Sequence, residues 1–285
     1  MALIITSIEK ETMNPLAGNI AELPVAGTTV EKIISSRFPV ALSRNVEVRA
    51  DFIPSRELAA RLAGAVPCTV TDPDDGSWLA RVSGASDLTI TPDAESIRIT
   101  YPWDLLKLNE MIVGSLADDE IAGEISPRAE IRGKIRLGQG SVILPGVFIE
   151  GNAVIGENCK IGPNCYIRGN TSVGDNCHIG QAVEIKNSII GNKVAIGHLS
   201  YAGDSVIMHR VNFGAGTIIS NFRHDGKNHK FKVGNELVDT GRRKFGAIIA
   251  ENVHTGIHTS IYPGRYLAEN TSTRPGEIVE HSKDK

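Results

Sequence analysis

The sequence predicts a mainly β protein whose largest part is a parallel β-helix, a solenoid in which strands from successive coils stack around one apolar core. The first observation is a repeat of isoleucine, leucine or valine every sixth residue, which runs without a break from Ile125 to Ile185. A period of six matches neither an α-helix nor a two-sided strand, and it is a signature of the β-helix. The second observation is that the repeat returns near the end of the chain, at Ile249, Thr255, Ile261, Leu267 and Thr273.

Composition excludes several classes of protein. The 285 residues are 41% hydrophobic and 22% charged, which excludes a disordered chain. The formal net charge of -3 gives no general attraction to nucleic acid or to an anionic membrane. No stretch approaches the roughly 18 apolar residues of a membrane span, and the first residues do not have the pattern of a signal peptide. We therefore expect a cytoplasmic protein with neither nucleic acid nor membrane as a partner.

Residues 1–100 show no six-residue repeat and are expected to form a small α+β domain. Short apolar runs alternate there with turn clusters such as Asp72-Pro-Asp-Asp-Gly. The pattern predicts helices at 30–36 and 55–62, and strands at 46–52, 69–71, 78–82 and 96–100.

Residues 101–120 are predicted to form a connecting helix. Pro102 suits the first turn of a helix, and Trp103, Leu106 and Met111 belong to one apolar stripe. The β-helix domain is then expected to occupy residues 121–285.

The repeat is interrupted in two ways. Five-residue steps after Ile185 and after Ala202 shift its register, and each should distort a turn. Between residues 222 and 246 the repeat stops, which predicts an inserted loop with a hairpin around Gly234-Asn235. Basic residues outnumber acidic ones in this insert.

Three of the four cysteines have a regular place in the repeat. Cys159, Cys165 and Cys177 each stand four positions after a six-period aliphatic residue, where small residues stand in other repeats. Because no Cys-x-x-Cys spacing is present, we expect them to be small core residues and not metal ligands.

Polar residues gather where the register shifts. Taken singly, each is most simply a solvated turn residue. Together they bring two cations suited to an anionic group, an imidazole, which in general titrates near pH 6.5, and a Gly-Ala-Gly turn that allows close approach of a ligand. The residues are Arg168, Lys186, His198, Tyr201, Asn212 and Asn221.

Longer motifs in the same region resemble a known family. The segments are Val183-Glu-Ile-Lys-Asn-Ser-Ile-Ile-Gly, Gly197-His-Leu-Ser-Tyr-Ala-Gly-Asp and Val211-Asn-Phe-Gly-Ala-Gly-Thr, with the connector Tyr101-Pro-Trp-Asp-Leu-Leu. They resemble the acetyltransferase half of the bifunctional glucosamine-1-phosphate N-acetyltransferase/UDP-N-acetylglucosamine pyrophosphorylase family, in its archaeal-type branch. The resemblance covers about residues 101–279.

The resemblance implies a left-handed parallel β-helix that assembles as a homotrimer, with active sites between subunits. It implies transfer of acetyl from acetyl-CoA to an amino-sugar 1-phosphate, glucosamine 1-phosphate first, in UDP-N-acetylglucosamine precursor synthesis, with no metal required. By position in the family's motifs, His198 is implied as the general base. The implied sugar-phosphate contacts are Arg168, Lys186, Tyr201 and Asn212.

Contacts with acetyl-CoA are implied at Ala215 and Asn221. Phe222 and Ile257 depart from the Tyr and Ser of the bacterial branch at positions that concern coenzyme A. We therefore expect the basic insert to take over some phosphate binding, through Arg242, Arg243 and Lys244.

Three alternatives stay open. Segments 15–18 and 23–34 faintly resemble a nucleotidyltransferase domain, but the family's Gly-x-Gly-Thr-Arg loop is missing, so a shortened relic is expected. A non-catalytic solenoid that binds a sugar nucleotide or a partner protein would follow if activity has been lost. A γ-type zinc carbonic anhydrase would use the same solenoid, but the spacing of the histidines gives no convincing ligand triad. The choice between a glucosamine and a galactosamine acceptor is also open.

Overall fold

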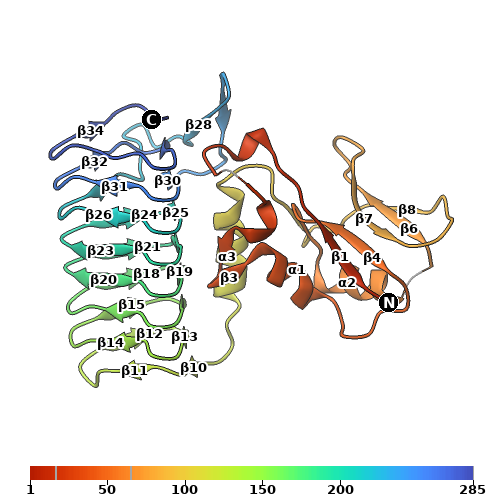
Figure 1. The fold of residues 1–285 in the computed structure, drawn as a ribbon, viewed down its shortest axis with the longest axis horizontal. Coiled ribbons are helices and arrows are strands. Elements are labelled where there is room, and N and C mark those ends of the chain that lie inside the picture. Colours follow the sequence, from red (N-terminus) through yellow and green to blue (C-terminus); the bar gives the residue numbers. More distant parts are fainter. Residues whose placement is uncertain (17, 65, 285) are drawn as a thin grey trace. The chain divides into compact units, whose positions relative to one another are not determined.

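The structure, a computed structural model, describes residues 1–16, 18–64 and 66–284 and divides the chain into two compact units (Figure 1). The first unit contains residues 1–10, 17–23 and 28–100, and the second contains residues 11–16, 24–27 and 101–285. Two short segments of the expected 1–100 domain are thus part of the second unit. Among the described residues, no helix is long and apolar enough to cross a membrane.

The first unit combines a mixed five-stranded sheet with helices. The sheet order is β1 (Leu3–Thr6), β4 (Val46–Arg49), β7 (Trp78–Val82), β6 (Cys68–Thr71) and β8 (Thr89–Ile90). A smaller sheet pairs β5 (Phe52–Ile53) with β9 (Ile97–Arg98), and the other elements are η2 (Ile20–Glu22), β3 (Thr28–Thr29), α1 (Val30–Arg37) and α2 (Arg56–Gly64). The predicted helices are confirmed, and β1 and β8 were not predicted.

The predicted strand at 46–52 is two strands, because a turn separates β4 from β5. This turn buries the Asp51 side chain completely. Lys10 Nζ and Arg49 Nη2 lie 2.5 and 2.8 Å from its carboxylate. A buried charge is tolerated when it is paired and hydrogen-bonded in this way.

The second unit begins with η1 (Glu11–Met13) and β2 (Pro24–Val25) and continues with α3 (Asp104–Gly114). The connecting helix is confirmed, but it spans only Asp104–Gly114 of the expected 101–120 and begins after Pro102. The Asp104 carboxylate accepts a hydrogen bond from the Tyr101 backbone N–H at 2.8 Å. A negative charge in the first turn also suits the positive end of the helix dipole.

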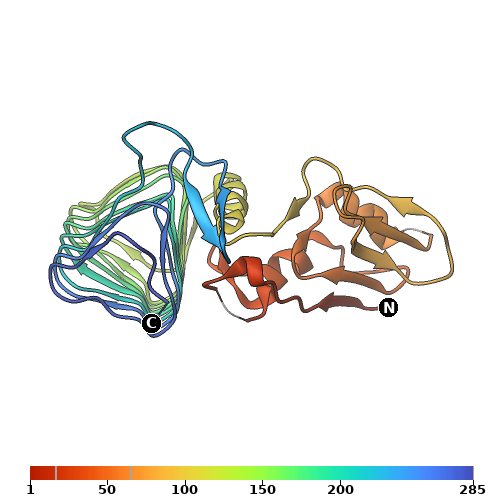
Figure 2. The same ribbon diagram turned by 90° about the horizontal axis from the view of Figure 1, so that it is seen from above.

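The rest of the second unit is a parallel β-helix with three flat faces, and Figure 2 shows its triangular outline. Face 1 consists of β10 (Glu120–Ile121), β13 (Ile135–Leu137), β16 (Ala153–Ile155), β19 (Thr171–Val173), β22 (Ile189–Ile190), β25 (Val206–Ile207), β30 (Ala247–Ile249) and β33 (Arg265–Leu267). Face 2 consists of β11 (Glu124–Ile125), β14 (Val142–Ile143), β17 (Lys160–Ile161), β20 (His178–Gln181), β23 (Ala195–His198), β26 (Asn212–Phe213) and β31 (His254–Thr255). Face 3 consists of β12 (Glu130–Arg132), β15 (Phe148–Glu150), β18 (Tyr166–Arg168), β21 (Glu184–Lys186), β24 (Tyr201–Gly203), β27 (Ile218–Ile219), β32 (Ser260–Ile261) and β34 (Ile278–Val279).

The six-residue repeat corresponds to one face of one coil. Ile143 pairs with Ile161 and Ile161 with Ile179, so a regular coil takes 18 residues. Aliphatic side chains of the repeat point inward and form one core with Cys159, Cys165 and Cys177. The predicted left-handed parallel β-helix and the core role of these cysteines are confirmed.

The insert is a hairpin anchored by aromatic side chains. β28 (Lys230–Val233) and β29 (Glu236–Asp239) pair antiparallel around Gly234-Asn235, as predicted. Phe231 is completely buried, and its ring centroid lies 5.3 Å from that of Trp103, 5.9 Å from Phe245 and 5.7 Å from Tyr266. The insert is therefore packed on the β-helix and on the start of α3.

Candidate functional site

Face 3 places the predicted polar residues in register. In a parallel ladder, residues at the same position of neighbouring strands lie about 4.8 Å apart. Arg168 pairs with Lys186, and Glu184 pairs with Tyr201. The side chains alternate with the inward-pointing Ile167, Ile185 and Ala202, so they form a polar column on the outside of three successive coils.

The two predicted cations of this column each have a carboxylate partner. Arg168 and Glu184 form an ion pair at 2.7 Å, and about a third of each side chain is exposed. Lys186 Nζ lies 2.8 Å from both carboxylate oxygens of Asp204, whose side chain is only 2% exposed. Water can compete for the hydrogen bonds of the partly exposed Arg168–Glu184 pair, whereas burial of Asp204 holds the Lys186–Asp204 pair in place.

Asp204 is the centre of a hydrogen-bond network. Besides Lys186, it accepts bonds from the side-chain amides of Asn187 at 3.1 Å and Asn221 at 2.5 Å. The Asn221 amide also donates to the Tyr201 hydroxyl at 2.9 Å. Burial raises the pKa of Tyr201, and the nearby Asp204 carboxylate raises it further. The phenol therefore stays protonated.

The two short steps of the repeat explain this network. They remove one residue from the corner between faces 3 and 1, so that Glu184 pairs with Tyr201 after 17 residues. Asn187 and Asp204 occupy the shortened corners with positive φ values of 46° and 51°. Asparagine and aspartate tolerate this left-handed conformation better than most residues. The predicted distortion of the turns thus brings these side chains against Lys186.

His198 lies at the corner between faces 2 and 3, at the end of β23. Its backbone carbonyl accepts bonds from the Ser200 hydroxyl at 2.8 Å and the Gly216 N–H at 3.2 Å. The side chain is exposed, and its ring has no hydrogen-bond partner in the described part of the chain. Tyr201 follows three residues later, so the imidazole stands at the edge of the polar column.

The Gly-Ala-Gly turn stacks on the same corner in the next coil. The Gly214 N–H donates to the Thr255 carbonyl and hydroxyl, both at 3.0 Å, and the Gly216 N–H donates to His198. These two groups are occupied and cannot serve a ligand. Within the described residues, the Ala215 N–H has no acceptor, so only this one of the three is free beside His198.

Asn212 lies apart from the group on face 3. It is exposed on β26 of face 2, in register with Ala195 and His254. A single chain therefore does not bring Asn212 together with Arg168 and Lys186. Asn221, expected beside acetyl-CoA, contacts Tyr201 and Asp204 within the chain, and its contact with acetyl-CoA stays a prediction.

The three predicted cations of the insert have other contacts. Arg242 forms an ion pair with Glu110 of α3, which also accepts a bond from Asn187 at 2.7 Å. Arg243 Nε donates to the Gly226 carbonyl at 3.0 Å, and Lys244 Nζ lies 3.8 Å from the Phe222 ring centroid. None of the three lines the hollow between the insert and the last coils.

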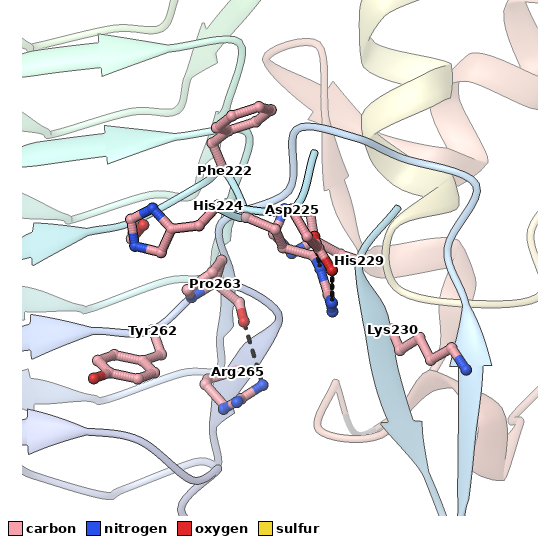
Figure 3. A pocket seen from close by; sticks show the side chains of 10 residues that line it. Phe222, His224, Asp225, His229, Lys230, Tyr262, Pro263 and Arg265 are labelled. Carbon is pink, nitrogen blue, oxygen red and sulfur yellow. Dashed lines mark hydrogen bonds and ion pairs between the residues drawn. The ribbon is translucent and has the colours of Figure 1, made fainter. Parts of the chain in front are cut away.

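That hollow, of about 560 Å³, lies between the insert and the last coils (Figure 3). Arg223, Lys230 and Arg265 line it together with the aromatic rings of Phe222 and Tyr262. Sequence reasoning missed Lys230 and Arg265 as site residues, because only the folded hairpin brings them together. Among the described residues, no three His, Cys, Asp or Glu side chains converge as metal ligands.

The chain is similar to known proteins over the β-helix. Residues 149–271 match the family described as the GMPPB C-terminal domain. A bifunctional sugar-1-phosphate nucleotidylyltransferase/acetyltransferase of Sulfurisphaera tokodaii is 39% identical over 181 residues, which are 64% of this chain and 45% of that protein. The bifunctional protein GlmU of Methanococcus maripaludis (strain C7) is 49% identical over 173 residues, 61% of this chain and 42% of that protein. The chain thus spans less than half the length of these relatives.

Solved structures with some similarity include the acetyltransferase domain of PglB from Neisseria gonorrhoeae. It is 21% identical, with a TM-score of 0.33, and the match covers 41% of this chain and 58% of that one. The UDP-N-acetylglucosamine O-acyltransferase of Moraxella catarrhalis is 16% identical, with a TM-score of 0.27, covering 53% and 66%.

Proposed function

We propose that this chain is an N-acetyltransferase that moves acetyl from acetyl-CoA to an amino-sugar 1-phosphate, glucosamine 1-phosphate first, because the relatives that it resembles include bifunctional GlmU-type nucleotidyltransferase/acetyltransferases. The observation that carries the proposal is the polar column on face 3, where Arg168, Lys186 and Tyr201 lie in successive coils with His198 at their edge.

The column suits a sugar phosphate. Lys186 is fixed by Asp204 and offers a positioned charge, whereas the exposed Arg168 pair with Glu184 costs little to break. Arg168 can therefore turn from Glu184 to two phosphate oxygens, which match its forked guanidinium. Tyr201 supplies a hydrogen bond to the sugar, and the Asn221 amide holds the Tyr201 hydroxyl in place.

His198 suits the role of general base. An amine attacks a thioester only in its neutral form, so the base must take the nitrogen proton as the C–N bond forms. The C–S bond then breaks, and the thiolate of coenzyme A receives the proton. The free Ala215 N–H beside His198 can stabilise the oxyanion of the tetrahedral intermediate. These steps use no metal and no covalent enzyme intermediate.

Asn212 contributes to this site only in an oligomer, because it lies on face 2 and the cations lie on face 3. We therefore include a homotrimer in the proposal, with each site between two subunits. A non-catalytic solenoid that binds a sugar nucleotide is the second candidate. The His198 ring is exposed and has no hydrogen-bond partner among the described residues, which favours the enzyme.

The test is acetyl transfer by the full chain from acetyl-CoA to glucosamine 1-phosphate, with galactosamine 1-phosphate as the competing acceptor. Replacing His198 by alanine should lower kcat by about 10²–10⁴-fold and leave KM for the sugar within a few-fold, because a base acts in the transition state. The His178→Ala variant, on the neighbouring strand β20 of the same face, serves as the control. Absence of transfer with either sugar, or full rate in H198A, would refute the enzymatic proposal or its base.

A further inference from the structure

The hollow beside the insert is lined by more cationic than anionic side chains. A second hollow of about 500 Å³ shares Arg223, Lys230 and Arg265 with the first and adds Lys232. The two hollows together have four permanent cations and two carboxylates, Asp225 and Asp284. A concave surface with this excess attracts anions.

The two carboxylates are already engaged. Asp225 forms an ion pair with Arg223 at 2.6 Å, and Asp284 accepts a bond from the Tyr266 hydroxyl at 2.5 Å. Lys230, Lys232 and Arg265 have no carboxylate within 4 Å in the described ranges 1–16, 18–64 and 66–284. Three cations therefore remain available to a ligand.

Arg265 is the most informative of the three. Its guanidinium is half-buried and donates to the backbone carbonyls of Glu280 at 2.6 Å and Pro263 at 3.3 Å. Burial lowers the pKa of Arg265, and the nearby Arg223 lowers it further. A partly buried guanidinium with a second arginine nearby, and with no carboxylate partner among the described residues, concentrates positive charge in the hollow.

The shape and lining of the hollow also limit which ligand can bind there. Phe222 and Tyr262 give it two aromatic walls, and its volume is that of a small-molecule site. Figure 3 shows Arg265 and Lys230 on separate segments, the last coils and the hairpin strand β28. The ligand should therefore combine phosphate groups with an apolar or aromatic part.

The hollow also adjoins the polar column. Ser220 and Phe222 line it, while Asn221 between them turns its amide to Tyr201 and Asp204. His229 contacts the Asn221 carbonyl at 3.2 Å and lines the hollow from the insert. A long ligand can thus reach the column with one end and the cations with the other.

We propose that this hollow binds the phosphorylated adenosine end of coenzyme A, with Arg265, Lys230 and Lys232 around its phosphates. The inference rests on the proposed acetyltransferase function and replaces Arg242, Arg243 and Lys244 as the phosphate-binding cations of the insert. A phosphorylated nucleotide from another source, such as a UDP-sugar, presents similar chemistry, so the experiment includes both.

The experiment is calorimetric titration of the full chain with coenzyme A, dephospho-coenzyme A and UDP-N-acetylglucosamine. The variants are Arg265→Gln and Lys232→Gln, and Lys227→Gln is the control, because Lys227 is an exposed cation of the same insert that lines neither hollow. We expect about tenfold weaker binding of coenzyme A in R265Q and K232Q, as for the loss of one charge-assisted hydrogen bond. Dephospho-coenzyme A should bind more weakly to the wild type and be affected less by R265Q, and K227Q should match the wild type.

The outcomes separate this proposal from the proposed function. Equal losses for coenzyme A and its dephospho form, or unchanged coenzyme A affinity in R265Q, would overturn the assignment of the hollow, even if acetyl transfer is observed. An R265Q-sensitive affinity for UDP-N-acetylglucosamine without coenzyme A binding would also overturn it and would support a nucleotide-sugar site. Coenzyme A binding that depends on Arg265, with no acetyl transfer, would leave the hollow in place and refute the enzyme.

Discussion

At the scale of single residues, the most consequential feature is the buried Asp204 carboxylate. It is 2% exposed and accepts bonds from Lys186, Asn187 and Asn221. A buried ion pair adds little net stability, because both groups lose hydration, but removing one partner leaves the other uncompensated. The cost should therefore depend on which partner is removed.

We predict that Lys186→Met lowers the free energy of unfolding by about 3 kcal/mol, because it leaves a buried negative charge. Asp204→Asn should cost about 1–2 kcal/mol, because Lys186 is 22% exposed and can reach water. Urea unfolding of both variants and of the double variant measures the difference. Equal costs for the two single variants would show that Asp204 is not effectively buried.

A second prediction concerns histidine and pH. Burial lowers the pKa of His229, His209 and His178, so each binds a proton less readily in the folded state than in the unfolded state, where the pKa is near 6.5. Their contribution is complete above about pH 6.5 and is lost as the pH falls through the lower folded values. The urea midpoint should therefore drop between pH 7 and pH 5. His229, 2% exposed, should dominate, and H229Q should flatten this slope.

At the scale of elements, the insert depends on one side chain. Phe231 is the completely buried residue of β28 and contacts Trp103, Phe245 and Tyr266. Phe231→Ala should lower the free energy of unfolding by about 3–5 kcal/mol and loosen the hairpin. Leu237→Ala is the matched control, because Leu237 is 67% exposed in the paired strand, and it should change stability by less than about 0.5 kcal/mol. Urea unfolding gives the energies, and faster hydrogen exchange at 230–239 in F231A alone would confirm the anchor.

The elements also explain how far the sequence could predict the fold and the site. The β-helix was predictable because the inward position of every face must be aliphatic, and six residues per face make that requirement visible as a period. Arg168 and Lys186, which the sequence analysis named as two cations, stack on face 3 because they stand one regular coil apart. Asp204 was missed because a carboxylate in a Gly-Asp turn has the pattern of a solvated residue. Its partner Lys186 lies 18 residues earlier, and only the stacking of shortened coils brings the two together.

The hollow was beyond sequence reasoning for a different reason. Its cations come from the loop at Arg223, the hairpin at Lys230 and the last coils at Arg265. No local pattern predicts where a hairpin folds back onto a solenoid. The excess of basic residues in the insert was visible, but which of them face a common space depends on tertiary packing.

At the scale of the whole molecule, several apolar side chains are exposed on the outer surface of the β-helix beside the polar column. Ile218 and Ile278 of face 3 are 42% and 57% exposed, and Leu199 and Ile257 at the corner between faces 2 and 3 are 60% and 50% exposed. Tyr201 and Ile218 are neighbours in the ladder, so the first of these apolar side chains follows the column directly, and Ser260 separates Ile218 from Ile278. We expect these exposed apolar side chains to face another chain in the proposed homotrimer.

The proposed homotrimer gives this surface a partner and gives the column an Asn212 from a second copy. We predict that Ile218→Glu yields a species of one 30.6 kDa chain, whereas the wild type has three times that mass, because a carboxylate cannot be buried unpaired in the interface. Light scattering coupled to size exclusion measures the mass, and circular dichroism verifies that the coils stay folded. Leu237→Glu, an equally drastic change on the exposed hairpin, should keep the trimer.

The I218E variant should also lose acetyl transfer. In a monomer, Asn212 no longer lies next to face 3 of a second chain. Full activity in a monomeric I218E would place the whole site within one chain and refute the shared site.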